Sequence, residues 1–122
     1  MQNDFCHIEL NTTDLEGAKK FYFELFSWDK EETPMPSGEL YTVIKPGKGP
    51  MGGMMKSPEP SAPPTWLVYI TIDDVEAVSK KAAELGGKIL LGKTPVPEIG
   101  HFSVIQDPQG AVFALWEPTE KG

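Results

Sequence analysis

Residues 66–87, WLVYITIDDVEAVSKKAAELGG, decide the fold because they read as a strand that runs directly into a helix. Side chains alternate in character along 66–72, which is the period of a strand. The pair Asp73-Asp74 supplies a helix N-cap, and Glu76 follows in the first turn, where a carboxylate suits the exposed N–H groups and the helix dipole. Apolar residues then recur at helical spacing up to Gly86-Gly87, where glycine can adopt the left-handed conformation that ends a helix.

The same pattern occurs 60 residues earlier, in residues 7–26, HIELNTTDLEGAKKFYFELF. At this constant offset five positions are identical: Asp14/Asp74, Glu16/Glu76, Lys20/Lys80, Glu24/Glu84 and Leu25/Leu85. The repeat continues at an offset of 61, where residues 41–44, YTVI, match residues 102–105, FSVI. A repeat of this period predicts two similar halves, each built as a strand, a helix and three strands.

The two halves are predicted to form one domain over residues 1–122, with a first module at 1–56, a Pro-rich linker at 57–65 and a second module at 66–122. In the first module we expect a helix at 14–27 and strands at 5–11, 28–33, 40–45 and 51–56. Its helix should pack on the sheet through Leu15, Ala18, Phe21/Tyr22, Leu25 and Phe26. In the second module we expect a helix with Val75, Val78, Ala82 and Leu85 on its apolar face, a turn-rich loop at 94–100, and strands at 66–72, 88–91, 102–106 and 111–117.

Bulk composition excludes several classes of partner. The net charge of −7 argues against a nucleic-acid backbone, which requires a basic surface. No lysine run suggests an anionic membrane, and no segment approaches the ~20 apolar residues of a membrane span. The single cysteine, Cys6, fits a reducing compartment and is expected to be a buried small side chain. The first ten residues lack a signal-peptide pattern, so the cytoplasm is the expected location.

Tandem βαβββ units of this kind resemble the vicinal oxygen chelate superfamily, which includes glyoxalase I (lactoylglutathione lyase), extradiol dioxygenases and bleomycin-resistance proteins. The chain looks most like the branch of predicted enzymes related to lactoylglutathione lyase. The segments that carry the resemblance are His7-Ile8-Glu9-Leu10, Thr13-Asp14, Ala18, Phe21-Tyr22, Leu25-Phe26-Ser27-Trp28, Trp66-Leu67-Val68-Tyr69, Asp73-Asp74-Val75, Leu85-Gly86-Gly87, Asp107-Pro108-Gln109-Gly110-Ala111 and Phe113-Ala114-Leu115-Trp116. The resemblance implies an α+β fold in which two βαβββ modules form a curved, mixed, mostly antiparallel sheet around a cleft. It also implies a homodimer, whose modules pair within a chain or are exchanged between chains.

Metal-dependent members of that family carry four ligands in the cleft, one from the first and one from the last strand of each module. The resemblance places these positions at His7, Gly53, Leu67 and Ala114, of which only His7 can bind a metal. An open catalytic site normally keeps about three protein ligands. We therefore expect no metal and no other cofactor. A weak divalent-cation site made by His7 with Glu9, two residues along the same strand face, is the alternative.

Strand alternation predicts an aromatic and methionine-rich cleft with a few polar groups, which suits a small organic ligand. Its predicted lining consists of His7, Glu9, Asn11, Met51, Met55, Leu67, Tyr69, Thr71, Val112 and Trp116. Ordinary packing is the alternative for Met54, Met55 and Trp116. For His7 the alternative to a ligand is a cleft histidine bonded to Glu9, Tyr69 or water. His101 is expected to be exposed, or else to close over the cleft.

Two classes of function follow. The first is binding of a small organic molecule without the four-ligand metal site. The second is a glyoxalase-related isomerase or lyase that uses His7 and Glu9 as metal ligand or as acid and base. A third, weaker reading is a structural or partner-binding module, which predicts a filled cleft. The sequence leaves the ligand unnamed, because the pocket depends on the loops at 28–40 and 92–101.

Overall fold

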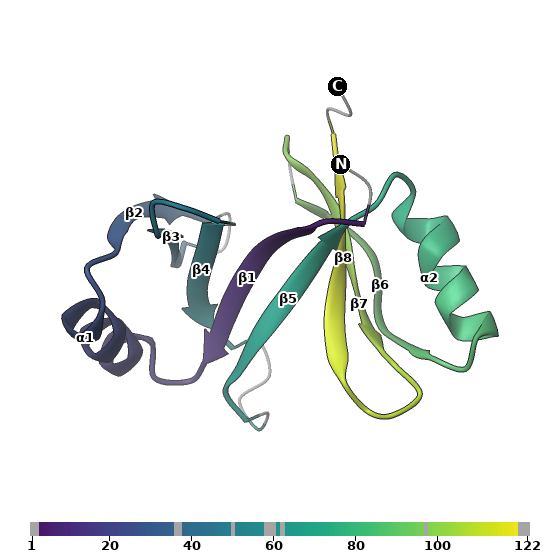
Figure 1. Ribbon diagram of the computed structural model, residues 1–122, viewed down its shortest axis with the longest axis horizontal. Helices are drawn as coiled ribbons and strands as arrows, with labels where there is room; N and C mark the ends of the chain where they lie inside the picture. Colours follow the sequence, from purple (N-terminus) through teal and green to yellow (C-terminus); the bar gives the residue numbers. More distant parts are fainter. Residues whose placement is uncertain are drawn as a thin grey trace. The chain divides into compact units, whose positions relative to one another are not determined.

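The computed structural model describes residues 3–35, 38–49, 51–57, 61, 63–96 and 98–119. The described residues form eight strands and two helices (Figure 1). In chain order these are β1 (Phe5–Thr12), α1 (Leu15–Leu25), β2 (Asp29–Pro34), β3 (Leu40–Lys45), β4 (Met51–Lys56), β5 (Thr65–Thr71), α2 (Val75–Glu84), β6 (Lys88–Val96), β7 (Gly100–Gln106) and β8 (Val112–Pro118). Both halves therefore have the predicted order of one strand, one helix and three strands.

The chain divides into two compact units, which are described in turn. The N-terminal unit is His7–Leu67, and the C-terminal unit combines Met1–Cys6 with Val68–Gly122. The start of the chain joins the C-terminal unit through backbone hydrogen bonds. The Asn3 N–H donates to the Thr71 carbonyl at 2.6 Å, and the Thr71 N–H donates to the Asp4 carbonyl at 2.9 Å.

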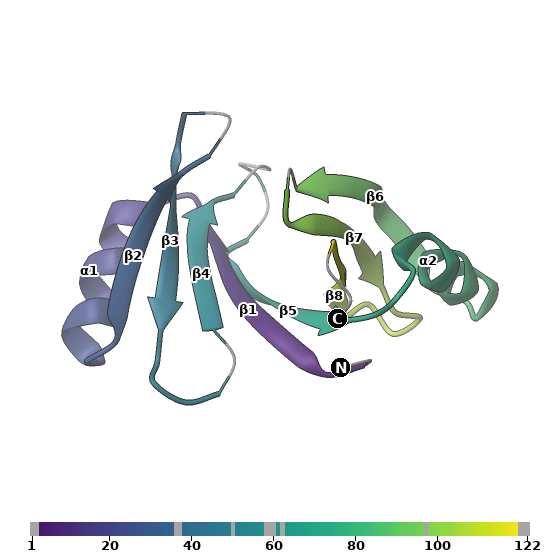
Figure 2. The same ribbon diagram turned by 90° about the horizontal axis from the view of Figure 1, so that it is seen from above.

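In the N-terminal unit the strands lie in the order β2-β3-β4-β1. β1 runs parallel to β4, whereas the β2–β3 and β3–β4 ladders are antiparallel. Helix α1 covers one face of this sheet (Figure 2). Under the helix lie the buried side chains of Leu10, Ile44 and Met54, and Leu15, Ala18, Tyr22, Phe23 and Trp28 pack against them. Met54 is therefore core, as its packing alternative predicted.

The C-terminal unit repeats this plan with the order β5-β8-β7-β6. β5 runs parallel to β8, and the β6–β7 and β7–β8 ladders are antiparallel. Helix α2 packs on its own sheet over a core of Ile72, Val75, Ile105 and Leu115. The predicted mixed, mostly antiparallel α+β architecture is confirmed in both units.

The repeat is reproduced at the helix caps. Asp14 accepts a hydrogen bond from the Gly17 N–H at 3.0 Å, and Asp74 accepts one from the Ala77 N–H at 3.1 Å. Each bond satisfies a donor that the first helical turn leaves without an intrahelical partner. Both helices begin at the residue after the capping aspartate, so the offset of 60 holds for the capping atoms themselves.

Two predictions about helix faces are wrong. Phe21, Leu25 and Phe26 are 60%, 58% and 43% exposed, and Phe23 packs inward in their place. Phe26 leaves the helix face because it is a C-cap residue with extended backbone, whereas Phe21 and Leu25 lie within α1 on the side that does not contact the core. Leu85 likewise lies beyond the end of α2 and is 71% exposed.

The prediction of a short strand at 88–91 followed by a loop at 94–100 is also wrong. β6 extends to Val96, which pairs with Gly100 of β7. Two register shifts, between Ile89 and Leu91 and between Leu91 and Thr94, allow the strand to continue past Gly92. Pro95 is tolerated because β6 is an edge strand.

Some expectations fall on residues outside the described ranges. These are the parts of the predicted linker at 58–60 and 62. Cys6 is half-buried rather than fully buried, with its Sγ 3.6 Å from the Tyr69 carbonyl oxygen. Neither described helix is long and apolar enough to cross a lipid bilayer.

Candidate functional site

Three polar side chains meet on the face of the N-terminal sheet opposite α1. His7 Nε2 lies 2.7 Å from Tyr41 Oη, and the Tyr41 hydroxyl donates to Glu9 Oε2 at 2.9 Å. The His7 and Tyr41 rings also stack, with centroids 6.3 Å apart and planes 24° from parallel. We call this arrangement the His7–Tyr41–Glu9 cluster.

Strand alternation explains why these side chains share a face. Leu10 on β1 and Ile44 on β3 are buried under α1. Their odd-numbered neighbours must point to the opposite face, because successive side chains of a strand alternate. His7 and Glu9 therefore face the same way as Tyr41. In the register of the sheet, Gly53 of β4 lies between Glu9 of β1 and Val43 of β3.

Gly53 is what allows Tyr41 to reach β1. A Cβ atom at position 53 would overlap Tyr41 Oη and the ring carbon that bears it. The Tyr41 ring thus occupies the space that a side chain at 53 would need. Gly53 is one of the four positions that the family resemblance assigns to metal ligands, so at this position the structure has a phenol from β3 in place of a side chain from β4.

The cluster sits in a largely desolvated environment. Glu9 is buried, and burial lowers the pKa of His7 below its ordinary value of 6.5. The imidazole is therefore neutral at pH 7 and carries one N–H. Since the Tyr41 hydroxyl gives its proton to Glu9, His7 Nε2–H donates to Tyr41 Oη, which assigns the Nε2–H tautomer. The result is a directed chain of hydrogen bonds from imidazole to phenol to carboxylate.

The remaining predicted residues of the N-terminal unit lie on β1, β4 and β5. Met51 is opposite His7 in the β1–β4 register and is 45% exposed. Met55 is opposite Asn11, and both are half-buried. Leu67 is buried. The predicted hydrogen-bond partners of His7 were Glu9, Tyr69 or water, whereas the structure shows Tyr41, which was not among the predicted site residues.

The C-terminal unit holds the other predicted residues on β5 and β8. Tyr69 is buried and lies opposite Ala114, and Thr71 lies opposite Trp116. The ring of Tyr69 lies 6.3 Å from that of Phe102, another residue missing from the prediction. Phe102 in turn lies opposite Trp116. Val112, at the start of β8, is largely exposed. The shared cleft that was to combine these residues with those of the N-terminal unit stays a prediction.

Sequence reasoning missed Tyr41 and Phe102 although a signal was present. The two residues occupy equivalent positions in the repeat, at the offset of 61, and each lies near the start of the third strand of its module. Their partners Glu9 and Tyr69 are mates at the offset of 60. The glycine pair Gly52-Gly53 in β4 is compatible with the close approach of another group, but nothing in the sequence identifies that group.

No three His, Cys, Asp or Glu side chains gather as a metal-binding group within the described ranges. His101 lies on β7 between Pro95 and Glu117 in the register of neighbouring strands and is half-buried. It is therefore not exposed as expected, and the alternative, that it closes over the cleft, stays a prediction.

The overlap at Gly53 predicts a specific coupling. Gly53→Ala should lower the free energy of unfolding by about 1–3 kcal/mol, because an added methyl group forces Tyr41 out of its place. In a Tyr41→Ala background the same change should be much less destabilising. Gly92→Ala is the control, since a Cβ there meets no atom within 4 Å. Urea denaturation of wild type, Gly53→Ala, Tyr41→Ala and the double variant measures this coupling. An equal loss of unfolding free energy from Gly53→Ala in both backgrounds would contradict the packing of Tyr41 over Gly53.

The neutral state of His7 predicts a dependence of stability on pH. Because burial holds the pKa of His7 in the folded chain below its ordinary value of 6.5, the unfolded chain binds this proton more readily. The free energy of unfolding should therefore decrease as the pH is lowered from 6.5 towards the folded pKa. His7→Gln should flatten that decrease. Thermal denaturation between pH 7.5 and 5.5 tests this, and identical slopes in wild type and His7→Gln would refute it.

Comparison with curated proteins finds relatives longer than this chain. It is 36% identical over 110 residues to "Putative glyoxylase CFP32" of Mycobacterium bovis, an alignment that covers 90% of this chain and 42% of the relative. It is 25% identical over 122 residues to "Anthracycline biosynthesis protein DnrV" of Streptomyces peucetius, covering 88% of this chain and 44% of that protein. The chain therefore spans about two fifths of the length of these relatives.

Among solved structures, the hypothetical protein BH1468 of Bacillus halodurans superposes with a TM-score of 0.74 at 14% identity. That superposition covers 100% of this chain and 99% of the other. At this identity the likeness concerns the fold alone. The model of the Glyoxalase/Bleomycin resistance protein/Dioxygenase superfamily matches residues 5–115. The chain thus belongs to the Glyoxalase/Bleomycin resistance protein/Dioxygenase superfamily, as the tandem modules predicted.

Proposed function

We propose that this protein binds a small organic molecule over the His7–Tyr41–Glu9 cluster, without the four-ligand metal site of its family. The observation that carries the proposal is the position of the Tyr41 hydroxyl, which is bonded to both His7 and Glu9 in the space above Gly53. The residues that could have held a cation are instead joined to a phenol.

A family-type metal does not fit these residues. Gly53, Leu67 and Ala114 present no donor atom from a side chain. His7 Nε2 is tied to Tyr41 Oη at 2.7 Å, and Glu9 Oε2 accepts from the same hydroxyl at 2.9 Å. A cation bound through these two atoms would have to break both hydrogen bonds. It would then have fewer protein ligands than the three or so that an open catalytic site usually keeps.

The chemistry of the site favours a flat, oxygen-bearing aromatic ligand. Met51 offers a polarisable and partly exposed side chain next to His7, which suits contact with an aromatic face. The cluster supplies a few oriented polar groups beside that apolar contact, the usual composition of a small-molecule site. The relative named as an anthracycline biosynthesis protein supports the same class of ligand. In this proposal the protein works as a homodimer in the cytoplasm.

Acid–base catalysis is the second candidate, because the hydrogen bonds form a continuous chain. A neutral imidazole can accept a proton from a substrate, and the Tyr41–Glu9 pair would orient the ring and stabilise the imidazolium that forms. The protein would then be an isomerase or lyase of the glyoxalase-related kind, which the name of the mycobacterial relative supports. His7 is the base in this reading, and Tyr41 and Glu9 are positioning residues.

The test is a thermal-shift screen of planar aromatic compounds, including an anthracyclinone, in the presence of EDTA, followed by calorimetry of the best ligand. We expect binding without metal. Tyr41→Phe should weaken it about tenfold, which is the loss of roughly one net hydrogen bond. Tyr22→Phe is the matched control, because its hydroxyl contacts Trp66 Nε1 at 3.3 Å and its ring packs in the core under α1.

Two results decide between the candidates. Binding that requires an added divalent cation, or that is the same in Tyr41→Phe and wild type, would contradict the binding proposal. Exchange of a ligand C–H for deuterium in D₂O, followed by NMR and lost in His7→Gln, would favour acid–base catalysis instead.

A further inference from the structure

The face of the N-terminal sheet that carries the His7–Tyr41–Glu9 cluster, which we call the cluster face, is poor in positive charge. The chain contains no arginine, so its permanently cationic side chains are all lysines. Most lysines of this unit lie on the other side of the sheet. Lys19 and Lys20 belong to α1, and Lys30 Nζ lies 4.9 Å from the centroid of the Phe23 ring, which packs under that helix. Lys56 lines a depression with residues of α1.

Lys45 is the lysine that does share the cluster face, and a carboxylate of the same face neutralises it. Alternation along β3 places Lys45 on the side of the cluster, and the β2–β3 register places Asp29 and Glu31 there too. Lys45 Nζ lies 3.1 Å from Glu31 Oε1. Lys48, the remaining lysine of the unit, lies in the exposed connection between β3 and β4. Glu9 and Asp29 therefore leave the strands of this face with a net negative charge.

The hydrogen bonds of the cluster run in one direction, towards Glu9. His7 Nε2–H donates to Tyr41 Oη, and the Tyr41 hydroxyl donates to Glu9 Oε2. A ligand carboxylate or phosphate would need such donors, and it would have to displace the buried carboxylate of Glu9 to obtain them. It would also bring a second negative charge close to Glu9, where water screens the repulsion poorly. An ammonium group brings hydrogen-bond donors and the opposite charge, so it gains from both effects.

The neighbouring side chains on β1 and β4 do not select a charge. Asn11 is a further polar residue of β1 on this face, and its half-buried amide can either donate or accept a hydrogen bond. Met51 and Met55, opposite His7 and Asn11 in the register, supply apolar contact alone. The charge preference of the cluster face therefore depends on Glu9.

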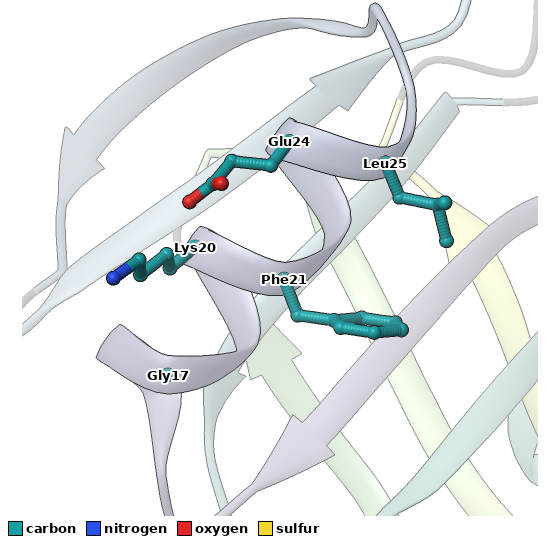
Figure 3. A pocket seen from close by; sticks show the side chains of 5 residues that line it. All are labelled: Gly17, Lys20, Phe21, Glu24 and Leu25. Atoms are coloured by element: carbon teal, nitrogen blue, oxygen red, sulfur yellow. The ribbon is translucent and has the colours of Figure 1, made fainter.

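The shallow depression on the outward side of α1 is the other place where a flat cationic ligand could bind. It is lined by Gly17, Lys20, Phe21, Glu24 and Leu25 (Figure 3). Phe21 and Leu25 would supply apolar contact, but Figure 3 shows that the side chains of Lys20 and Glu24 extend to the same side of the helix. Because the lysine offsets the charge of the neighbouring carboxylate, this depression does not favour a cation over a neutral molecule.

We propose that the cluster face selects a positively charged ligand, an aromatic amine in its ammonium form, and rejects carboxylates and phosphates. Glu9 sets this specificity, because its buried carboxylate lies within the cluster, whereas Asp29 lies on the edge strand β2. The ammonium group lies near Glu9, and the ring system of the ligand contacts Met51. This specificity rests on the binding function proposed above, to which it adds the charge of the ligand.

Three probes that share one ring system test the proposal. Each is an anthraquinone with a different substituent at the same ring position: aminomethyl, which is an ammonium at neutral pH, hydroxymethyl, which is neutral, or carboxylate. Calorimetry at neutral pH in the presence of EDTA measures their affinities. The ammonium probe should bind about tenfold more tightly than the neutral probe, and the carboxylate probe about tenfold more weakly, as expected for one unit charge near a buried carboxylate.

Variants that remove one charge locate the selecting group. Glu9→Gln keeps the shape of the side chain and should bring the ammonium and neutral probes to within about twofold of each other. Glu24→Gln removes the same charge from the outward side of α1 and should leave the preference unchanged. Tyr41→Phe should weaken all three probes but keep their order, because the charge of Glu9 remains. Thermal denaturation checks the folding of each variant, and the order of the three affinities in wild type decides the proposal if Glu9→Gln does not fold.

The outcomes separate this specificity from the binding function itself. If no probe binds, the proposed binding function is overturned and the charge preference with it. If the three probes bind equally, or if the carboxylate binds most tightly, the protein binds such ligands but the proposed specificity is wrong. A preference for the ammonium probe that persists in Glu9→Gln and disappears in Glu24→Gln would place the cation at the depression on α1 and would also overturn the proposal.

Discussion

The arrangement of the candidate site depends on one contact, the passage of the Tyr41 ring over Gly53. Because a Cβ atom at 53 would overlap the phenol oxygen, a ligating side chain at this position and the present Tyr41 rotamer exclude each other. With glycine there, Tyr41 crosses from β3 to β1 and bonds to His7 and Glu9. A single glycine thus determines whether this sheet face presents separate donor atoms or a closed hydrogen-bonded chain.

The two units show how one plan supports two chemical surfaces. Glu9, Tyr41 and Gly53 have Tyr69, Phe102 and Ala114 as their mates in the repeat. In the first set the Tyr41 hydroxyl donates to Glu9, whereas in the second set the rings of Tyr69 and Phe102 are in contact. The cores under the two helices stay closely equivalent. Divergence is therefore concentrated on the sheet faces opposite the helices, which is where the family resemblance places the site.

Much of the fold could be predicted from the sequence, because its main signals are local. The capping aspartates Asp14 and Asp74 and the alternation along β1 and β5 each fix the structure of their own neighbourhood. The length of β6 could not be predicted, since it depends on register shifts that allow pairing to continue past Gly92. The exposure of Phe21 and Leu25 could not be predicted either, because α1 has apolar residues on two sides and only tertiary packing decides which side is buried.

For the site, alternation placed His7 and Glu9 on the correct face, but it could not supply Tyr41. That contact joins residues 32 and 34 positions apart and depends on a diagonal reach across β4. Residue spacing predicts which side chains share a face of the sheet. Which of those side chains bond to each other depends on their rotamers and, here, on the absence of a side chain at Gly53. The identity of the ligand could not be predicted from the sequence either, because it depends on the shape of the surface that those rotamers create.

The most direct test of this account is the metal content of the purified chain, measured by plasma mass spectrometry after incubation with nickel, zinc, manganese and iron and subsequent desalting. Because Tyr41 occupies the ligand position above Gly53, we expect far less than one metal ion per wild-type chain. We expect more metal in a Tyr41→Ala/Gly53→Glu variant, where the phenol is replaced by a carboxylate beside His7 and Glu9. A wild-type chain that retains close to one metal ion, and loses it in His7→Ala, would contradict the account.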